Sequence, residues 1–139
     1  MSEITNQELI EKAKSVINPH QLVNRMVGDV GCALVTDRGN FYLGVCIDLG
    51  SGIGFCAEHS AIAAMVTAGE YRIKKIVAVW QDEESTHILA PCGRCRELIY
   101  QIDPSNLETE IILDQNKILK LAEILPYSDW FQKLKQQSP

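Results

Sequence analysis

The chain has 139 residues, a hydrophobic fraction of 46% and a formal net charge of -5 at pH 7, which suits one domain over residues 1–139 with a core that needs no disulfide bonds. This acidic balance argues against a nucleic acid polymer as partner, because phosphate binding needs clustered Lys and Arg. No apolar stretch is long enough to predict a membrane span, residues 1–9 are too polar for a signal peptide, and five cysteines without an export signal favour a reducing, cytoplasmic location.

The first half of the chain predicts a helix followed by a β-hairpin. Residues 6–17 carry apolar side chains at helical spacing, and Asn18-Pro19 ends that run. Residues 30–36 and 41–47 are apolar and flank the turn signal Asp37-Arg38-Gly39-Asn40, which predicts two strands joined by a short loop.

The second half alternates helices with strands. The alanine-rich residues 56–68, closed by Gly69, predict a helix, and the segment from Cys92 to Ile102 predicts another that ends before Pro104. Strands are predicted over 73–80, 109–113 and 118–121, with an acidic loop over 81–86 and a candidate terminal helix over 127–137. Such alternation indicates a three-layer α/β domain.

Two cysteine segments carry the clearest chemical signal. Cys56-Ala57-Glu58 and Pro91-Cys92-Gly93-Arg94-Cys95 supply three thiols and one carboxylate. Three thiols suit a tetrahedral Zn²⁺ whose fourth position stays open for water, and a glutamate beside that water can carry protons. Because Cys56 and Cys92 both start predicted helices, the helix dipoles favour their thiolate forms. The pattern predicts a zinc-dependent hydrolytic deaminase.

The expected reaction assigns a task to each part of this pattern. Zinc lowers the pKa of bound water, Glu58 accepts its proton, and the oxygen attacks an amine-bearing ring carbon. Glu58 then returns protons to the ring nitrogen and to the leaving ammonia. The carbonyls near Ala57 and Ala90 are expected to orient the amine. Charge compensation for the thiolates is expected from nearby positive groups, namely His59, Arg94 and Arg96.

A purely structural zinc site is the main alternative from the residues alone. That site would need four protein ligands, whereas the two other cysteines, Cys32 and Cys46, lie in predicted strands, where buried cysteines usually serve packing. It would also leave Glu58 without a role. A non-catalytic, zinc-stabilised ligand-binding domain remains the alternative from another functional class.

The same segments resemble the cytidine deaminase superfamily, most closely its small homotetrameric branch, which includes cytidine deaminases and blasticidin S deaminase. The resemblance rests on VGCAL at 30–34, GVC at 44–46, CAE at 56–58, PCGRCR at 91–96 and EILPY at 123–127. It implies a mixed five-stranded sheet between helices and a homotetramer with shared active sites. It also implies Cys56, Cys92 and Cys95 as zinc ligands and Glu58 as proton shuttle.

Several positions depart from the family pattern in the substrate region. The Asn-x-Glu pair that holds the ribose in cytidine deaminases aligns with Cys46 and Asp48, a family aromatic aligns with Gly28, and the arginine that often follows CAE is His59. Cys46 and Asp48 are therefore candidate substrate contacts. The expected substrate is a free aminopyrimidine nucleoside or nucleoside-like compound, with another aminated base or antibiotic as alternative.

Overall fold

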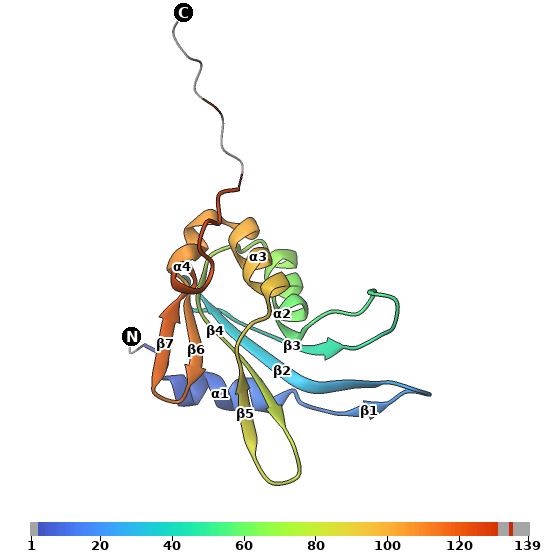
Figure 1. The fold of residues 1–139 in the computed structure, drawn as a ribbon. Coiled ribbons are helices and arrows are strands. Elements are labelled where there is room, and N and C mark those ends of the chain that lie inside the picture. Colours follow the sequence, from blue (N-terminus) through green and yellow to red (C-terminus); the bar gives the residue numbers. More distant parts are fainter. Residues whose placement is uncertain (1–2, 131–133, 135–139) are drawn as a thin grey trace, which may run out of the picture.

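One mixed β-sheet forms the middle layer of the fold (Figure 1). The computed structural model describes residues 3–130 and residue 134, and the sheet has seven strands within them. The path β1-β2-β4-β6-β7 carries β3 beside β2 and β5 beside β4, and only the β4–β6 pair is parallel. The strands are β1 His20–Gln21, β2 Met26–Thr36, β3 Phe41–Ile47, β4 Ile73–Gln81, β5 Thr86–Leu89, β6 Glu110–Asp114 and β7 Lys117–Lys120.

Helices cover both faces of this sheet. Helix α1 (Asn6–Ser15) lies on one face, and α2 (Ala57–Thr67) and α3 (Gly93–Ile102) lie on the other (Figure 1). A short 3₁₀ helix, η1 (Pro104–Glu108), follows α3, and α4 (Leu121–Ile124) follows β7. The α/β/α layering predicted from the alternation of elements is therefore confirmed.

The start of α1 shows how local sequence fixes a helix end. The Thr5 hydroxyl accepts a hydrogen bond from the Glu8 backbone N–H at 3.1 Å, and the Glu8 carboxylate accepts one from the Thr5 N–H at 2.9 Å. This reciprocal capping box satisfies two donors that a helix start leaves unpaired.

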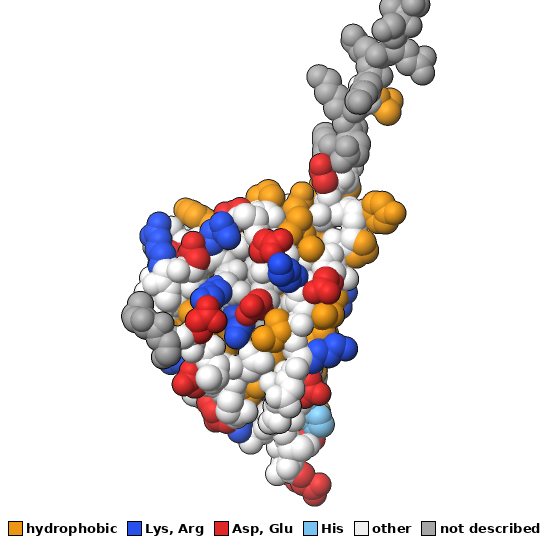
Figure 2. Space-filling view, turned by 90° about the vertical axis from the view of Figure 1, so that its left-hand side faces the viewer, with side chains coloured by type: hydrophobic (Ala, Val, Ile, Leu, Met, Phe, Trp, Pro, Cys, Tyr) orange, Lys and Arg blue, Asp and Glu red, His pale blue; other side chains and the backbone are white. Residues whose placement is uncertain are grey.

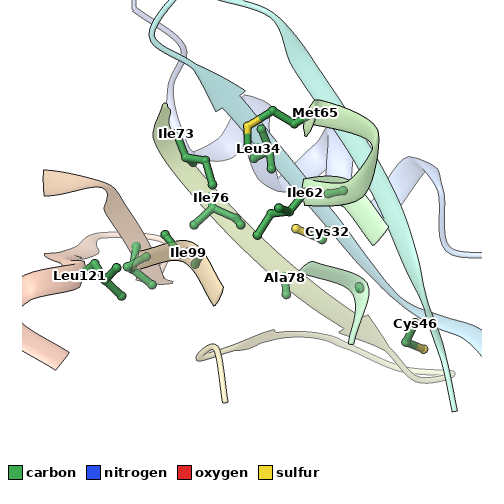
Figure 3. Close-up of a cluster of buried hydrophobic side chains, with 13 residues drawn as sticks. Cys32, Leu34, Cys46, Ile62, Met65, Ile73, Ile76, Ala78, Ile99 and Leu121 are labelled. Atoms are coloured by element: carbon green, nitrogen blue, oxygen red, sulfur yellow. The ribbon is translucent and has the colours of Figure 1, made fainter. Parts of the chain in front are cut away.

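The two central strands bury side chains on both faces, because successive residues of a strand point to opposite sides. Cys32 and Leu34 of β2 pack with Ile62 and Met65 of α2 in the larger core cluster (Figure 3). Ala33 and Val35, which alternate with them along β2, face the opposite side and belong to the second core cluster, between the sheet and α1. This cluster contains Leu9, Ile10, Ala13, Ala33, Val35, Val77, Val79 and Ile112. Burial on both faces explains why residues 30–35 of β2 and 76–79 of β4 are continuous apolar runs.

The position of α2 depends on a close approach to β3. A Cβ atom at Gly44 would lie 2.4 Å from the backbone nitrogen of Ala61 and 2.4 Å from the Cβ atom of Ser60. The Ser60 hydroxyl donates to the Val45 carbonyl at 2.6 Å across the same contact. Only glycine allows this helix to sit so near the strand, and α2 begins at the cysteine-rich site.

Two expectations need correction. The expected five strands become seven, because β1 and β5 were not predicted; β5 begins at the end of the segment assigned as an acidic loop. Of the candidate terminal helix over 127–137, residues 127–130 are not helical, and residues 131–133 and 135–137 lie outside the described residues. Within the described part of the chain, no helix is long and apolar enough to cross a membrane.

Candidate active site

The predicted zinc ligands lie at the N-terminal ends of α2 and α3. Cys56 immediately precedes α2, with φ -74° and ψ 162°, and Cys92 immediately precedes α3, with φ -68° and ψ 171°. Neither side chain makes a capping hydrogen bond. Both thiols are therefore left for another partner, and both lie where the helix dipoles favour negative charge.

The three thiols lie at a spacing that suits one metal ion. The distance between the sulfurs of Cys56 and Cys92 is 3.6 Å, and that between the sulfurs of Cys92 and Cys95 is 3.4 Å. Tetrahedral zinc with Zn–S bonds of about 2.3 Å places its sulfur ligands about 3.8 Å apart. The donor set therefore fits Zn²⁺ with small adjustments. None of the five cysteines forms a disulfide.

Glu58 is buried beside these thiols. It lies in the first turn of α2, and only 5% of it is exposed. Burial raises the pKa of its carboxyl, although its own backbone N–H and the Cys95 side chain oppose that shift. A carboxyl whose pKa is moved toward neutrality is suited to accept and return protons.

A cavity of about 180 Å³ opens beside Glu58. This volume lies below the about 300–1,000 Å³ of drug-sized pockets, so it suits a single small ring. Two larger hollows, of about 440 and 640 Å³, lie beside α1 and away from the thiols, so size alone does not mark the site. Seven residues singled out from the sequence line the small cavity: Cys46, Asp48, Cys56, Ala57, Glu58, Ala90 and Cys92.

Of the three groups expected to compensate thiolate charge, His59 contacts a thiol. Its Nδ1 is 3.5 Å from the sulfur of Cys95, and its ring stacks on Phe55 at a centroid distance of 6.2 Å. The side chains of Cys56, His59 and Cys95 could together hold a metal ion, since their donor atoms lie within 4.8 Å of one another. Burial and the nearby Arg94 lower the pKa of His59, which favours the neutral ring.

The two arginines donate to backbone carbonyls. Arg94 Nη1 donates to the carbonyl of Gly54 at 3.1 Å. Arg96 Nε donates to the carbonyl of Pro91 at 2.8 Å, and its Nη1 donates to that of Ile124 at 3.0 Å. Arg96 therefore fastens the turn that carries Cys92 to the segment after β7.

Cys46 of the cavity wall contacts a residue that the sequence reasoning missed, Asp29. The thiol of Cys46 donates to the Asp29 carboxylate at 3.1 Å. Burial and this hydrogen bond raise the pKa of Cys46 to about 11, so the thiol stays protonated. Asp29 directly precedes Val30, at the edge of the VGCAL segment, and that adjacency was the available signal.

Three further aromatic residues do not line the small cavity. His87 Nε2 is 3.0 Å from the Asp82 carboxylate, and its ring stacks on Trp80, so it belongs to the β4–β5 hairpin and does not line the small cavity. Tyr127 is 97% exposed and Trp130 is 65% exposed in the segment after α4.

Residues 3–109 match the family described as the cytidine and deoxycytidylate deaminase zinc-binding region. Blasticidin-S deaminase of Bacillus cereus is 33% identical over 128 residues, which cover 86% of this chain and 88% of that protein. Cytidine deaminase of Mycoplasma genitalium is 31% identical over 88 residues, 63% of this chain and 64% of that protein.

Solved structures give the same result for the fold. The crystal structure of cytidine deaminase from Mycobacterium leprae superimposes with a TM-score of 0.72 at 26% identity, covering 89% of this chain and 99% of that one. The enzyme from Burkholderia pseudomallei gives a TM-score of 0.71 at 26% identity, covering 89% and 98%. The predicted resemblance and the predicted zinc cofactor are confirmed at the level of the family: the chain belongs to the cytidine and deoxycytidylate deaminases.

Proposed function

We propose that the protein is a zinc-dependent hydrolase that deaminates a free aminopyrimidine nucleoside or nucleoside-like compound and releases ammonia. The observation that supports this proposal is the meeting of three thiols and one buried carboxyl at a single small cavity. Cys56, Cys92 and Cys95 are the proposed zinc ligands, and Glu58 is the proposed catalytic residue.

The proposed chemistry divides between the metal and the chain. Bound zinc supplies a lowered pKa for the attacking water. Glu58 removes one proton from that water, and its burial keeps the pKa of the carboxyl high enough to give the proton back. Water oxygen adds to the amine-bearing ring carbon, and Glu58 passes the first proton to the ring nitrogen. Glu58 then takes the remaining proton from the new hydroxyl group and gives it to the amine, so that the C–N bond breaks and leaves a ring carbonyl and ammonia.

The protein's own backbone completes the orientation of the ring. Ala57, which follows Cys56, and Ala90, which precedes Pro91, both line the cavity. Their backbone carbonyls are the proposed acceptors for the amine N–H groups. The apolar side chains of Val30, Ala78 and Leu89 line the same cavity and exclude water from the ring faces.

A free small molecule is the proposed substrate, as opposed to a nucleic acid polymer. The cavity is small, and on the face shown in Figure 2 basic and acidic side chains are interspersed without a basic stripe. A polymer site would need such a stripe together with stacking aromatics. The likeness to a blasticidin-S deaminase favours an aminated antibiotic as the second candidate substrate.

Assembly and location complete the proposal. A homotetramer with shared active sites fits the exposed apolar side chains of Leu89, which lines the cavity, and of Leu49 and Ile53 on the loop after Asp48; they are 37%, 37% and 69% exposed. Light scattering tests this assembly, and a monodisperse monomer contradicts it. A cytoplasmic location is proposed from the five free cysteines.

The decisive experiment measures ammonia release and zinc content together. Wild type, Glu58→Gln and Glu83→Gln are assayed with cytidine, deoxycytidine, cytosine and blasticidin S. Glu83 is an exposed acid on the β4–β5 loop and provides a matched control for the loss of one carboxylate. We expect Glu58→Gln to keep its zinc and lose at least about 100-fold in turnover, while Glu83→Gln matches wild type.

Two results would refute the proposal. Equal turnover in wild type and Glu58→Gln removes the carboxyl from the reaction. Zinc-loaded wild type that binds these compounds without converting any of them indicates the non-catalytic ligand-binding alternative.

A further inference from the structure

The five cysteines of the chain differ in their access to solvent. Cys92 is exposed and Cys56 is half-buried, whereas Cys32 and Cys46 are buried in the larger core cluster (Figure 3). Cys95 is also buried, with an exposed fraction of 0%. A reagent dissolved in water therefore has its most direct access to Cys92.

The exposed Cys92 lies beside a buried thiol on the same helical turn. Its sulfur is 3.4 Å from that of Cys95, and only two residues separate the pair at the start of α3. A Cys-x-x-Cys pair at a helix N-terminus is a recurrent motif of thiol–disulfide chemistry. Here the first thiol of the pair can be reached by solvent and the second is enclosed by the protein.

A second sulfur, that of Cys56, also lies near Cys92, at 3.6 Å. Cys56 precedes α2, so a bond to it would join two helices and would require them to keep their relative position. Cys95 has no such requirement, because it shares one turn with Cys92. Arg96 holds that turn in place, since its Nε donates to the Pro91 carbonyl at 2.8 Å. Cys95 is therefore the favoured partner.

We propose that Cys92 and Cys95 form a site of reversible oxidation, at which a peroxide joins their sulfurs in a disulfide and removes two of the three proposed zinc ligands. Oxidation then switches the site off, and a dithiol reductant together with zinc switches it on again. This inference rests on the ligand set of the proposed function, but it does not depend on the deamination reaction.

Hydrogen peroxide supplies all the oxidising equivalents that this reaction needs. The Cys92 thiolate attacks one peroxide oxygen, the O–O bond breaks, and a sulfenic acid on Cys92 and a hydroxide ion are formed. The Cys95 thiolate then attacks the Cys92 sulfur, an S–S bond forms, and the S–O bond breaks to release a second hydroxide. The two sulfurs together lose two electrons, and protons from the solvent convert both hydroxides to water.

The test treats zinc-loaded wild type with one equivalent of hydrogen peroxide and measures zinc and thiols instead of turnover. We expect each chain to release its zinc and two of its five thiols to disappear. The mass of the denatured chain should fall by about 2 Da, because two hydrogens are lost. Dithiothreitol with added zinc should reverse all three changes, and the buried Cys32 and Cys46 should stay reduced throughout.

Tryptic mapping without reductant identifies the bond. Trypsin cleaves between the two cysteines, after Arg94, so the proposed disulfide should leave peptide 76–94 attached to the dipeptide that begins with Cys95. A link from peptide 76–94 to the peptide that carries Cys56 would overturn the assignment to Cys95.

A matched variant and a reference thiol make the result decisive. Cys32→Ala removes a buried thiol outside the proposed site and should give the same zinc release and the same linked peptide. If wild type keeps its zinc and all five thiols under peroxide that oxidises glutathione completely, the inference is overturned, even if the protein deaminates cytidine. If the zinc-loaded protein deaminates none of the test compounds, the deaminase proposal fails, and zinc release and the peptide map still decide this inference.

Discussion

Gly44→Ala should disturb both the stability and the chemistry of this protein, because it separates α2 from the sheet. The added methyl would lie 2.4 Å from the backbone nitrogen of Ala61 and 2.7 Å from the carbonyl carbon of Ser60. Carbon atoms in contact prefer separations of about 3.5–4.0 Å. The contact is therefore about 1 Å too short, and since the opposing atoms are backbone, the helix must move.

Two opposing effects set the change in stability. Overpacking costs about 1–3 kcal/mol, whereas the lower entropy of the unfolded chain with alanine returns only about 0.4–1 kcal/mol. Overpacking prevails, so the free energy of unfolding should fall by about 1–2 kcal/mol. Because α2 carries Glu58, a displacement of about 1 Å should also reduce kcat/KM by about 100-fold.

The assay combines urea unfolding with turnover of the zinc-loaded enzyme. Gly93→Ala is the matched control for the urea midpoint, because a Cβ there meets no atom within 4 Å, and its midpoint should lie at or slightly above the wild-type value, since the entropic gain is then unopposed. If Gly44→Ala unfolds at the wild-type midpoint and turns over normally, the helix is not held by this contact and the reasoning fails.

Two further predictions concern buried polar groups. Asn106 is fully buried; its side-chain oxygen accepts from the Ile73 N–H, and its amide donates to two backbone carbonyls. Asn106→Ala should therefore lower the free energy of unfolding by about 3 kcal/mol or more in urea titrations. A loss below about 1 kcal/mol would contradict this expectation. Hydrogen bonding from the Tyr42 hydroxyl lowers the pKa of Glu70 from its ordinary 4.5. That contribution is full above the unfolded pKa and disappears as pH falls through the folded one. Glu70→Gln should therefore lower the urea midpoint near neutral pH, and the difference should narrow below about pH 4.5; a constant difference down to about pH 3 would exclude this explanation.

The elements that frame the site could be predicted from local sequence. Gly69 marks the end of α2, Pro91 precedes α3, and the Asp37–Asn40 turn separates β2 from β3 within the predicted bounds. The two missed strands lacked such signals. β1 has two polar residues, and β5 is a four-residue, mostly exposed strand beside an acidic loop. Both depend on pairing with β2 or β4, which is tertiary information.

The hydrogen bond from Cys46 to Asp29 illustrates what local sequence could not show. Val27 pairs with Ile47 and Gly31 pairs with Val45, so four steps along β2 oppose two steps along β3. This bulge turns Asp29 toward Cys46. Gly28 makes the bulge possible, because its φ is 78° and a Cβ there would lie 2.4 Å from a carbonyl oxygen. In the sequence, Gly28 was notable only because the family pattern has an aromatic residue at this position.

The uncapped helix starts at Cys56 and Cys92 have a consequence for assembly of the native chain. These two residues are 36 positions apart, and one ion held by both thiols would close the intervening chain into a loop. By analogy with a disulfide, such a cross-link removes unfolded-state entropy worth about 4 kcal/mol. The ion that serves the reaction would then also act as a staple between two helices. Metal-free protein should therefore unfold and lose its turnover, and refolding it in the presence of metal should restore both the fold and the activity.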